Sequence, residues 1–258
     1  MALRAEGVSL SIHRKHLLQS TDFCLEGGEI VAICGPNGAG KSSLLRLLSA
    51  DIHASGGRVS LNDRPLASWA ARARAQTLGV LSQQTHLNFA FSVEEVVTLG
   101  RTPHASGRLR DQQIVTAALR AVASDHLRAR CYTDLSGGEQ QRVQLARVLA
   151  QLWEPSPHGE RFLLLDEPTA SLDLAHQALV LDVVKDFAAQ GVGVCLVVHD
   201  LNLAARCADR LLLLREGGIV AAGSPVEVLT ETTLQAVFDV KVQVLTHPQR
   251  AVPLVVQA

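Results

Sequence analysis

The stretch GPNGAGKS at residues 35–42 follows the apolar run EIVAIC and has the spacing glycine, four residues, glycine, lysine, serine. This is the spacing of a phosphate-binding loop, in which glycines let successive backbone N–H groups curl around phosphate oxygens. Lys41 is expected to reach the β- and γ-phosphates, and the Ser42 hydroxyl to ligate Mg²⁺. A helix beginning here would direct the positive end of its dipole at the phosphates. The predicted nucleotide-binding residues are Gly35, Pro36, Asn37, Gly38, Ala39, Gly40, Lys41, Ser42 and Ser43.

Two later segments carry further polar groups that suit nucleotide hydrolysis. FLLLDEP, at residues 162–168, is an apolar strand that ends in paired carboxylates. Asp166 can hold Mg²⁺, and Glu167 can polarise an attacking water molecule. LSGGEQQR, at residues 135–142, places a serine and two glycines at the start of an expected helix.

The order of apolar runs predicts an α/β protein with parallel strands in its core. Strand-like and helix-like runs alternate around the phosphate loop and again after residue 160. Helix-favouring stretches such as EQQRVQLARVLAQLW dominate between them, which predicts a helical subdomain. We therefore divide the chain into residues 1–91, with β-rich runs and the phosphate loop, residues 92–153, the helical subdomain, and residues 154–258, the second part of the core.

Composition restricts the classes of partner. A formal net charge of -1 provides no broad cationic surface for phosphate backbones, so we expect no nucleic acid partner. No apolar run reaches the roughly eighteen residues that a membrane helix needs, and the first residues lack the apolar centre of a secretory signal. The five cysteines form no CxxC pair, and Cys34 and Cys195 lie in apolar runs, so we expect reduced, buried thiols.

With the phosphate loop, LSGGEQQR and FLLLDEP resemble the motifs of the ATP-binding-cassette family, and the resemblance extends over nearly the whole chain. It implies a P-loop nucleotide-hydrolase fold with an N-terminal antiparallel β subdomain and a helical subdomain, and it implies ATP and Mg²⁺ as ligands. Ser136, Gly137 and Gly138 match the loop that meets the γ-phosphate held by another subunit. Asp173 matches the aspartate of a loop at the dimer contact.

Two more residues match family positions with roles in hydrolysis. Gln83 matches the glutamine that senses the γ-phosphate and Mg²⁺, with Gln84 as an alternative one residue away. His199 follows the strand-like run VCLVV and matches the histidine that contacts the γ-phosphate. The aromatic residue that usually stacks on adenine would lie near Ile12 or His13, where no aromatic residue occurs. The resemblance thus predicts Glu167, His199 and Gln83 as catalytic residues, Ser42, Gln83 and Asp166 at the metal, and weak discrimination between bases.

The resemblance also implies an assembly. One phosphate loop and one LSGG loop pair between subunits across each ATP, which predicts a homodimer that encloses two ATP molecules. The dimer would drive a separate transmembrane permease dimer from the cytoplasmic face of a bacterial inner membrane, supplied indirectly by a periplasmic substrate-binding protein.

Within the family, VLSQQTHLNFAFSVEEVVTLGRTPH and SLDLAHQ are similar to the haemin-import branch, so haem is the expected cargo. Ferric siderophores and cobalamin are alternative cargoes, and a soluble ATPase without a transport role is a further alternative.

Two local patterns remain ambiguous in the sequence. Phe89 and Phe91 would share one face at strand spacing, either as anchors for the permease or as core residues. Arg101, Arg108 and Arg110 form a basic stretch, for which a solvated surface is the favoured interpretation over a phosphate-binding role.

Overall fold

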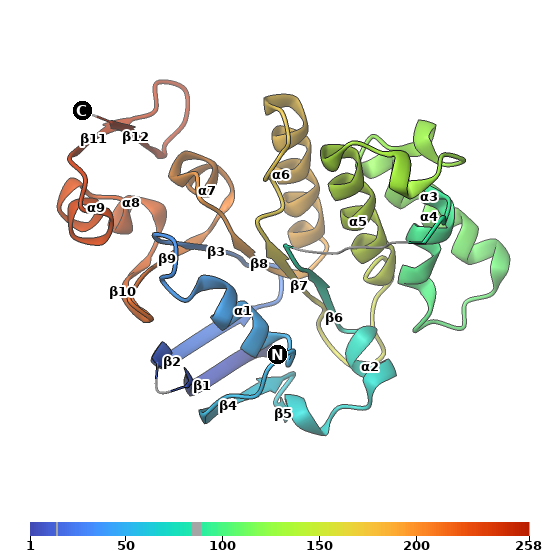
Figure 1. Ribbon diagram of the computed structural model, residues 1–258, viewed down its shortest axis with the longest axis horizontal. Helices are drawn as coiled ribbons and strands as arrows, with labels where there is room; N and C mark the ends of the chain where they lie inside the picture. The colour runs from blue at the N-terminus through green and yellow to red at the C-terminus, as the bar shows by residue number, and fades with distance from the viewer. Residues whose placement is uncertain (14, 84–88, 258) are drawn as a thin grey trace.

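The computed structural model describes residues 1–13, 15–83 and 89–257 and contains three sheets with helices around them (Figure 1). Three helices begin with a capping box, in which a serine and a glutamate three residues later exchange hydrogen bonds with each other's backbone N–H. The α-helices are α1 (Lys41–Leu48), α2 (Ala71–Ala75), α3 (Val93–Thr98), α4 (Arg108–Ala121), α5 (Gly137–Gln151), α6 (Leu174–Ala189), α7 (Leu201–Cys207), α8 (Pro225–Val228) and α9 (Glu231–Phe238). Short 3-10 turns cover Leu66–Ser68, Leu99–Arg101, Asp125–Leu127 and Tyr132–Asp134.

The central sheet has six strands in the order β10-β9-β3-β8-β7-β6, all parallel except β10. Its middle strands are buried along their whole length because helices or the second sheet cover both faces. Phe162 and Leu164 of β7 face one hydrophobic cluster, while Leu163 and Leu165 face the other. The strands are β3 (Ile30–Cys34), β6 (Leu78–Leu81), β7 (Phe162–Asp166), β8 (Gly193–Val197), β9 (Arg210–Arg215) and β10 (Gly218–Gly223).

A second, antiparallel sheet of order β2-β1-β4-β5 lies beside α1 (Figure 1). It packs against the central sheet through the hydrophobic cluster that contains Leu44 and Leu48 of α1. This sheet and the phosphate loop therefore share one core. Its strands are β1 (Ala2–Ile12), β2 (Lys15–Glu26), β4 (Gly56–Leu61) and β5 (Arg64–Pro65).

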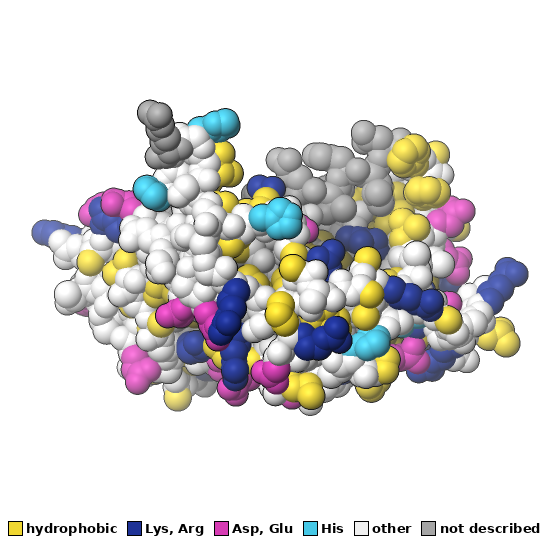
Figure 2. Space-filling view, turned by 90° about the horizontal axis from the view of Figure 1, so that it is seen from below, with side chains coloured by type: hydrophobic (Ala, Val, Ile, Leu, Met, Phe, Trp, Pro, Cys, Tyr) yellow, Lys and Arg dark blue, Asp and Glu magenta, His cyan; other side chains and the backbone are white. Residues whose placement is uncertain are grey.

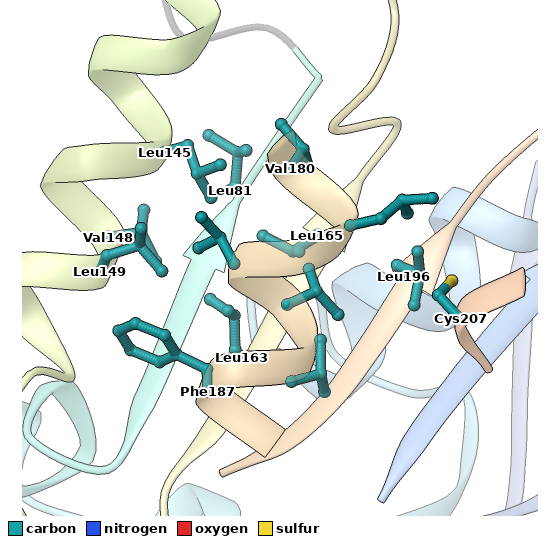
Figure 3. Close-up of a cluster of buried hydrophobic side chains, with 14 of the residues drawn as sticks. Leu81, Leu145, Val148, Leu149, Leu163, Leu165, Val180, Phe187, Leu196 and Cys207 are labelled. Carbon is teal, nitrogen blue, oxygen red and sulfur yellow. The ribbon is translucent and has the colours of Figure 1, made fainter. Parts of the chain in front are cut away.

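The larger hydrophobic cluster joins the helical region to the central sheet (Figure 3). Leu145, Val148 and Leu149 of α5 point toward Leu81 of β6, and Phe187 of α6 lies at the lower end of the same cluster. The helices α3, α4 and α5 lie between β6 and β7 in the chain. Because β6 and β7 are paired in the central sheet, the helical region leaves the sheet and returns to it at neighbouring strands.

The strand–helix alternation and the β9–β10 hairpin agree with the expected α/β class. All five cysteines are unpaired as expected, and Cys34, Cys195 and Cys207 are buried, but Cys24 and Cys131 are partly exposed, contrary to the expectation of buried thiols. Burial raises the pKa of Cys34 to about 12, which keeps this thiol protonated.

The C-terminal segment adds the hairpin of β11 (Val242–Thr246) and β12 (Pro253–Gln257). The Asn202 side chain in α7 donates to the Val255 carbonyl oxygen at 3.0 Å and accepts from the Val255 N–H at 2.8 Å. This pair of hydrogen bonds attaches the hairpin to the helix that follows β8.

Acidic and basic side chains are interspersed on the face shown in Figure 2. Charge on this face is therefore compensated locally. Among the described residues, no helix combines the length and the apolar character needed to cross a bilayer.

Candidate nucleotide site

The phosphate loop connects β3 to α1 in backbone conformations that favour glycine. Gly35, Gly38 and Gly40 have φ angles of 147°, 77° and 100°. A Cβ at Gly35 would lie 2.2 Å from the Leu214 carbonyl oxygen, so a side chain there would displace the neighbouring strand. The loop can therefore bring its N–H groups close to a bound anion without obstruction by side chains.

Lys41, at the start of α1, is buried and folds back over the loop. Its Nζ donates to the carbonyl oxygens of Gly35 at 2.8 Å and Pro36 at 2.9 Å. Burial lowers the pKa of Lys41, whereas the carboxylates of Glu167 and Asp166 oppose that shift. An anion in the loop would give this ammonium the charged partner that carbonyl oxygens do not provide.

Ser42 and Asp166 place a hydroxyl and a carboxylate side by side. The Ser42 hydroxyl donates to Asp166 Oδ1 at 3.3 Å, and the carboxyl group of Asp166 lies at the end of β7. Burial raises the pKa of Asp166, while the hydrogen bond from Ser42 opposes the rise. A hydroxyl and a carboxylate are the hard donors that Mg²⁺ prefers, with water and phosphate oxygens as its remaining ligands. The residues present thus fit Mg²⁺ bound together with a nucleotide.

Glu167, the next residue, is held by donors from two other elements. Its Oε1 lies 2.5 Å from Nε2 of His199, which follows β8, and its Oε2 accepts from Gln83 Nε2 at 3.0 Å. Gln83 follows β6, so three neighbouring strands bring these side chains together at one edge of the sheet. The alternative sensor, Gln84, lies outside the described residues.

The Glu167 backbone is also constrained. Glu167 has φ 53°, a left-handed conformation that costs a residue with a side chain on the order of 1 kcal/mol. Gln141 of α5 donates from Nε2 to the Glu167 carbonyl oxygen at 2.8 Å. Sequence reasoning did not single out Gln141.

The LSGG residues occupy a different place. Ser136 caps α5, and Gly137 and Gly138 form its first turn. Asp173 caps α6 and accepts from the His176 N–H at 2.8 Å. These four residues line a surface hollow of about 560 Å³. The phosphate loop opens into another hollow, of about 470 Å³, and the two share no lining residue. A third hollow, of about 200 Å³, is lined by Gly137 together with Gln83 and Asp166. Within one chain, then, the two groups adjoin through Gly137, but no LSGG residue lines the phosphate-loop hollow.

The side of the nucleotide hollow toward β2 differs from the sequence-based expectation. Lys15 and Leu17 line it, whereas Ile12 and His13 do not. Lys15 pairs with Ile12 across the β1–β2 hairpin. The residue that lines the hollow is therefore next to the position where the sequence comparison expected a base-stacking residue.

Comparison with known proteins places this geometry in a family. The sequence profile described as ABC transporter matches residues 18–170. The chain belongs to the ABC transporter family. Members similar over nearly the full length include the hemin import ATP-binding protein HmuV of Pseudomonas fluorescens, which is 51% identical over 98% of this chain and 99% of its own. The corresponding protein of Myxococcus xanthus is 49% identical over 99% of this chain and 97% of its own.

Solved structures agree with this membership. An inward-facing ABC transporter of the metal-chelate type matches with TM-score 0.81 and 30% identity, over 100% of this chain and 97% of that one. A dimeric bacterial ABC transporter cassette matches with TM-score 0.77 and 23% identity, over 86% of this chain and 98% of that one, which shows the shared fold. The ABC-family fold predicted from the sequence is confirmed.

Proposed function

We propose that this chain is the ATP-hydrolysing subunit of a haem importer, working as a homodimer on a transmembrane permease at the cytoplasmic face of the inner membrane. The observation that carries the dimer is the lining of the phosphate-loop hollow, which includes none of the residues Ser136, Gly137, Gly138 and Asp173 of the same chain. A second copy can place its LSGG residues over the phosphates bound by the first, and an isologous pair completes two sites.

The side chains of the phosphate-loop group suit in-line attack of water on a γ-phosphate. Lys41 would release the loop carbonyls and pair with the β- and γ-phosphates. Gln83 and His199 would exchange the Glu167 carboxylate for γ-phosphate oxygens, which leaves Glu167 free to accept a proton from the attacking water. Ser42, Asp166 and Gln83 would hold Mg²⁺, whose positive charge stabilises the phosphate oxygens.

A mixing experiment tests the shared site. Lys41→Ala disables the phosphate-loop group, and Gly137→Asp places a negative charge beside the partner's γ-phosphate. A Cβ at Gly137 meets no atom within 4 Å, and an acidic residue in a first helical turn is favourable, so Gly137→Asp should fold. Gly137→Asn is the neutral control of similar shape.

Each disabled homodimer should be nearly inactive. An equal mixture should recover about one quarter of the wild-type rate, because half of the dimers combine the two variants and each retains one intact site. Activity of the mixture that stays equal to the mean of the two separate variants would refute a site shared between chains.

The cargo is proposed from the similarity to hemin import ATP-binding proteins. The protein with its permease in liposomes, and with the periplasmic binding protein outside, should transport haem only when Glu167 is intact. Uptake of cobalamin or a ferric siderophore, without uptake of haem, would refute the haem assignment and leave the importer ATPase in place.

The exposed Phe89 side chain is proposed as an anchor for the permease. Phe89 is 67% exposed and its ring centroid lies 5.9 Å from that of Phe91, which packs against the core. An exposed aromatic residue fixed by a buried neighbour is a common form of interface anchor.

A further inference from the structure

The nucleotide hollow extends beyond the phosphate loop to the first residues of β2. Lys15 and Leu17 line that side, while the phosphate loop, the start of α1, Gln83 and Glu167 line the remainder. A phosphate chain bound in the loop would therefore direct the rest of the nucleotide either toward Lys15 and Leu17 or into solvent.

Lys15 and Leu17 both line the hollow, whereas His16 between them does not. A β-bulge interrupts the pairing with β1 between His16 and Leu18, at Leu17. His16 contacts Ser11 Oγ through Nδ1 at 2.8 Å. The Leu17 carbonyl oxygen would lie 2.7 Å from a Cβ on Gly40, which places β2 directly beside the first turn of α1.

The two side chains differ in mobility and in chemistry. Leu17 packs against the second hydrophobic cluster, so its position is fixed. Lys15 is exposed and makes no ion pair with any residue in the described ranges. It is a cation with three hydrogen-bond donors and no acceptor.

The side of the hollow formed by Lys15 and Leu17 suits a purine base but does not favour adenine. Among the described residues that line the hollow, none is aromatic, so an apolar contact with Leu17 replaces stacking on a ring. On its exocyclic edge guanine presents two acceptors, N7 and O6, whereas adenine presents N7 and the donor N6. An ammonium group can bond to both guanine acceptors and meets a donor on adenine.

We infer that Lys15 and Leu17 form the base-contacting wall of this site, and that the wall admits guanine at least as well as adenine, so that the protein hydrolyses GTP as well as ATP. This inference rests on the proposed nucleotide hydrolysis and adds the residues that select the base.

Steady-state hydrolysis by the full-length protein, with ATP, GTP and ITP, tests the inference. In the wild type, kcat/KM for GTP should be within about threefold of that for ATP, or above it. ITP keeps O6 and N7 and lacks the 2-amino group, so it should behave as GTP does. Lys15→Met keeps the length of the side chain and removes the donors, and it should lower kcat/KM for GTP about tenfold through KM while kcat is maintained.

Two variants separate base recognition from other effects. Lys15→Arg retains a cationic donor and should keep GTP hydrolysis, and His16→Ala, at a residue that does not line the hollow, should change the hydrolysis of neither nucleotide. A hundredfold preference of the wild type for ATP would overturn the inference, as would an equal loss with ATP and GTP in Lys15→Met, which would place Lys15 at the phosphates. Absence of hydrolysis with every nucleotide would instead refute the proposed ATPase function.

Discussion

The phosphate-loop group and the LSGG group belong to the same kind of ATP site but are built differently. Lys41 and Asp166 are 6% and 7% exposed and are hydrogen-bonded within their own chain. Ser136 and Asp173 are exposed, and their hydrogen bonds mainly cap helices. The phosphate-loop group is therefore preassembled within the chain, whereas the LSGG group presents helix N-termini whose ligand, in the proposed dimer, would be the nucleotide bound by the other chain.

The largest expected effect comes from removing the proposed general base. Glu167→Gln keeps the side-chain size, so ATP binding should persist, while loss of a positioned base lowers kcat by about 10² to 10⁴. Hydrolysis and nucleotide binding are measured on the same preparation, and Glu216→Gln, the same substitution at an exposed glutamate outside the site, serves as a control. A rate within tenfold of wild type would exclude Glu167 as the general base, and the phosphate-loop group would then have no assigned base.

Removing Arg101 should destabilise the helical region that carries the LSGG group. The Arg101 guanidinium is almost fully buried and bonds to Asp111 at 2.9 Å, to Glu154 at 2.8 Å and to the Ala150 carbonyl oxygen at 2.8 Å. Arg101→Met should lower the free energy of unfolding by about 3 kcal/mol, because it strands two partly buried carboxylates. Denaturant titration measures this loss. Arg110→Met, at the exposed pair with the same Glu154, should cost under about 1 kcal/mol, and equal losses in both variants would contradict the argument.

The same ion pairs predict an acid sensitivity. Burial acts to raise the pKa of Asp111, but hydrogen bonds from Arg101 and Ser106 outweigh it and lower the pKa. A carboxyl group with a lowered pKa stabilises the fold fully above its usual value of about 4, and this stabilisation is lost as the pH falls. Unfolding of Arg101→Met should therefore depend less on pH below about 4 than unfolding of the wild type.

Phe89 and Phe91 should separate docking from folding. Phe91→Ala is expected to destabilise the protein by about 2 kcal/mol, because its ring is partly buried against the core. Phe89→Ala should change stability by under about 0.5 kcal/mol but weaken binding to the permease. Melting temperature and co-purification with the permease distinguish the two effects, with Leu109→Ala as a control at another exposed apolar residue. Normal binding by Phe89→Ala would remove Phe89 from the interface.

The smallest expected effect is at the C-terminal hairpin, far in sequence from both groups. Asn202→Ala removes two hydrogen bonds to Val255, and the hairpin should open more readily by about 1 to 2 kcal/mol. Hydrogen exchange at the Val255 amide measures the opening. ATP hydrolysis should remain within about twofold of wild type, since Asp200 still caps α7 beside His199. A loss of activity comparable to that of Glu167→Gln would show that the hairpin positions the phosphate-loop group.

The sequence predicted those parts of the site that lie in short continuous motifs. The phosphate loop, the carboxylates after β7 and the capped start of α5 each depend on a few adjacent residues, which is why spacing alone identifies them. The subdomain limits at residues 92 and 153 and the catalytic roles stay predictions. Contacts between distant segments were not predictable from such motifs. The contact between β2 and Gly40, for example, depends on how the whole chain folds.

One interpretation was wrong, and a second was wrong in part, for the same reason. Phe89 and Phe91 lie in a bend before α3 rather than in a strand, so their spacing does not place them on one face. Arg108 and Arg110 are exposed, as expected, but Arg101 lies in a buried ion-pair network formed with carboxylates 10 and 53 residues away in the chain. Local spacing carries no information about partners at such separations.

The hydrogen bond from Gln141 to the Glu167 carbonyl oxygen links two functions of one subunit. Gln141 lies in the first turns of α5, the helix that Ser136 caps, and Glu167 would act on the nucleotide bound by its own chain. In the proposed dimer, that helix would meet the other nucleotide. Any shift of the helix on meeting that nucleotide either moves the Glu167 backbone or breaks this bond. Nucleotide binding at one site of the proposed dimer would then be thermodynamically linked to the position of Glu167 at the other site. Each nucleotide would therefore affect the hydrolysis of the other.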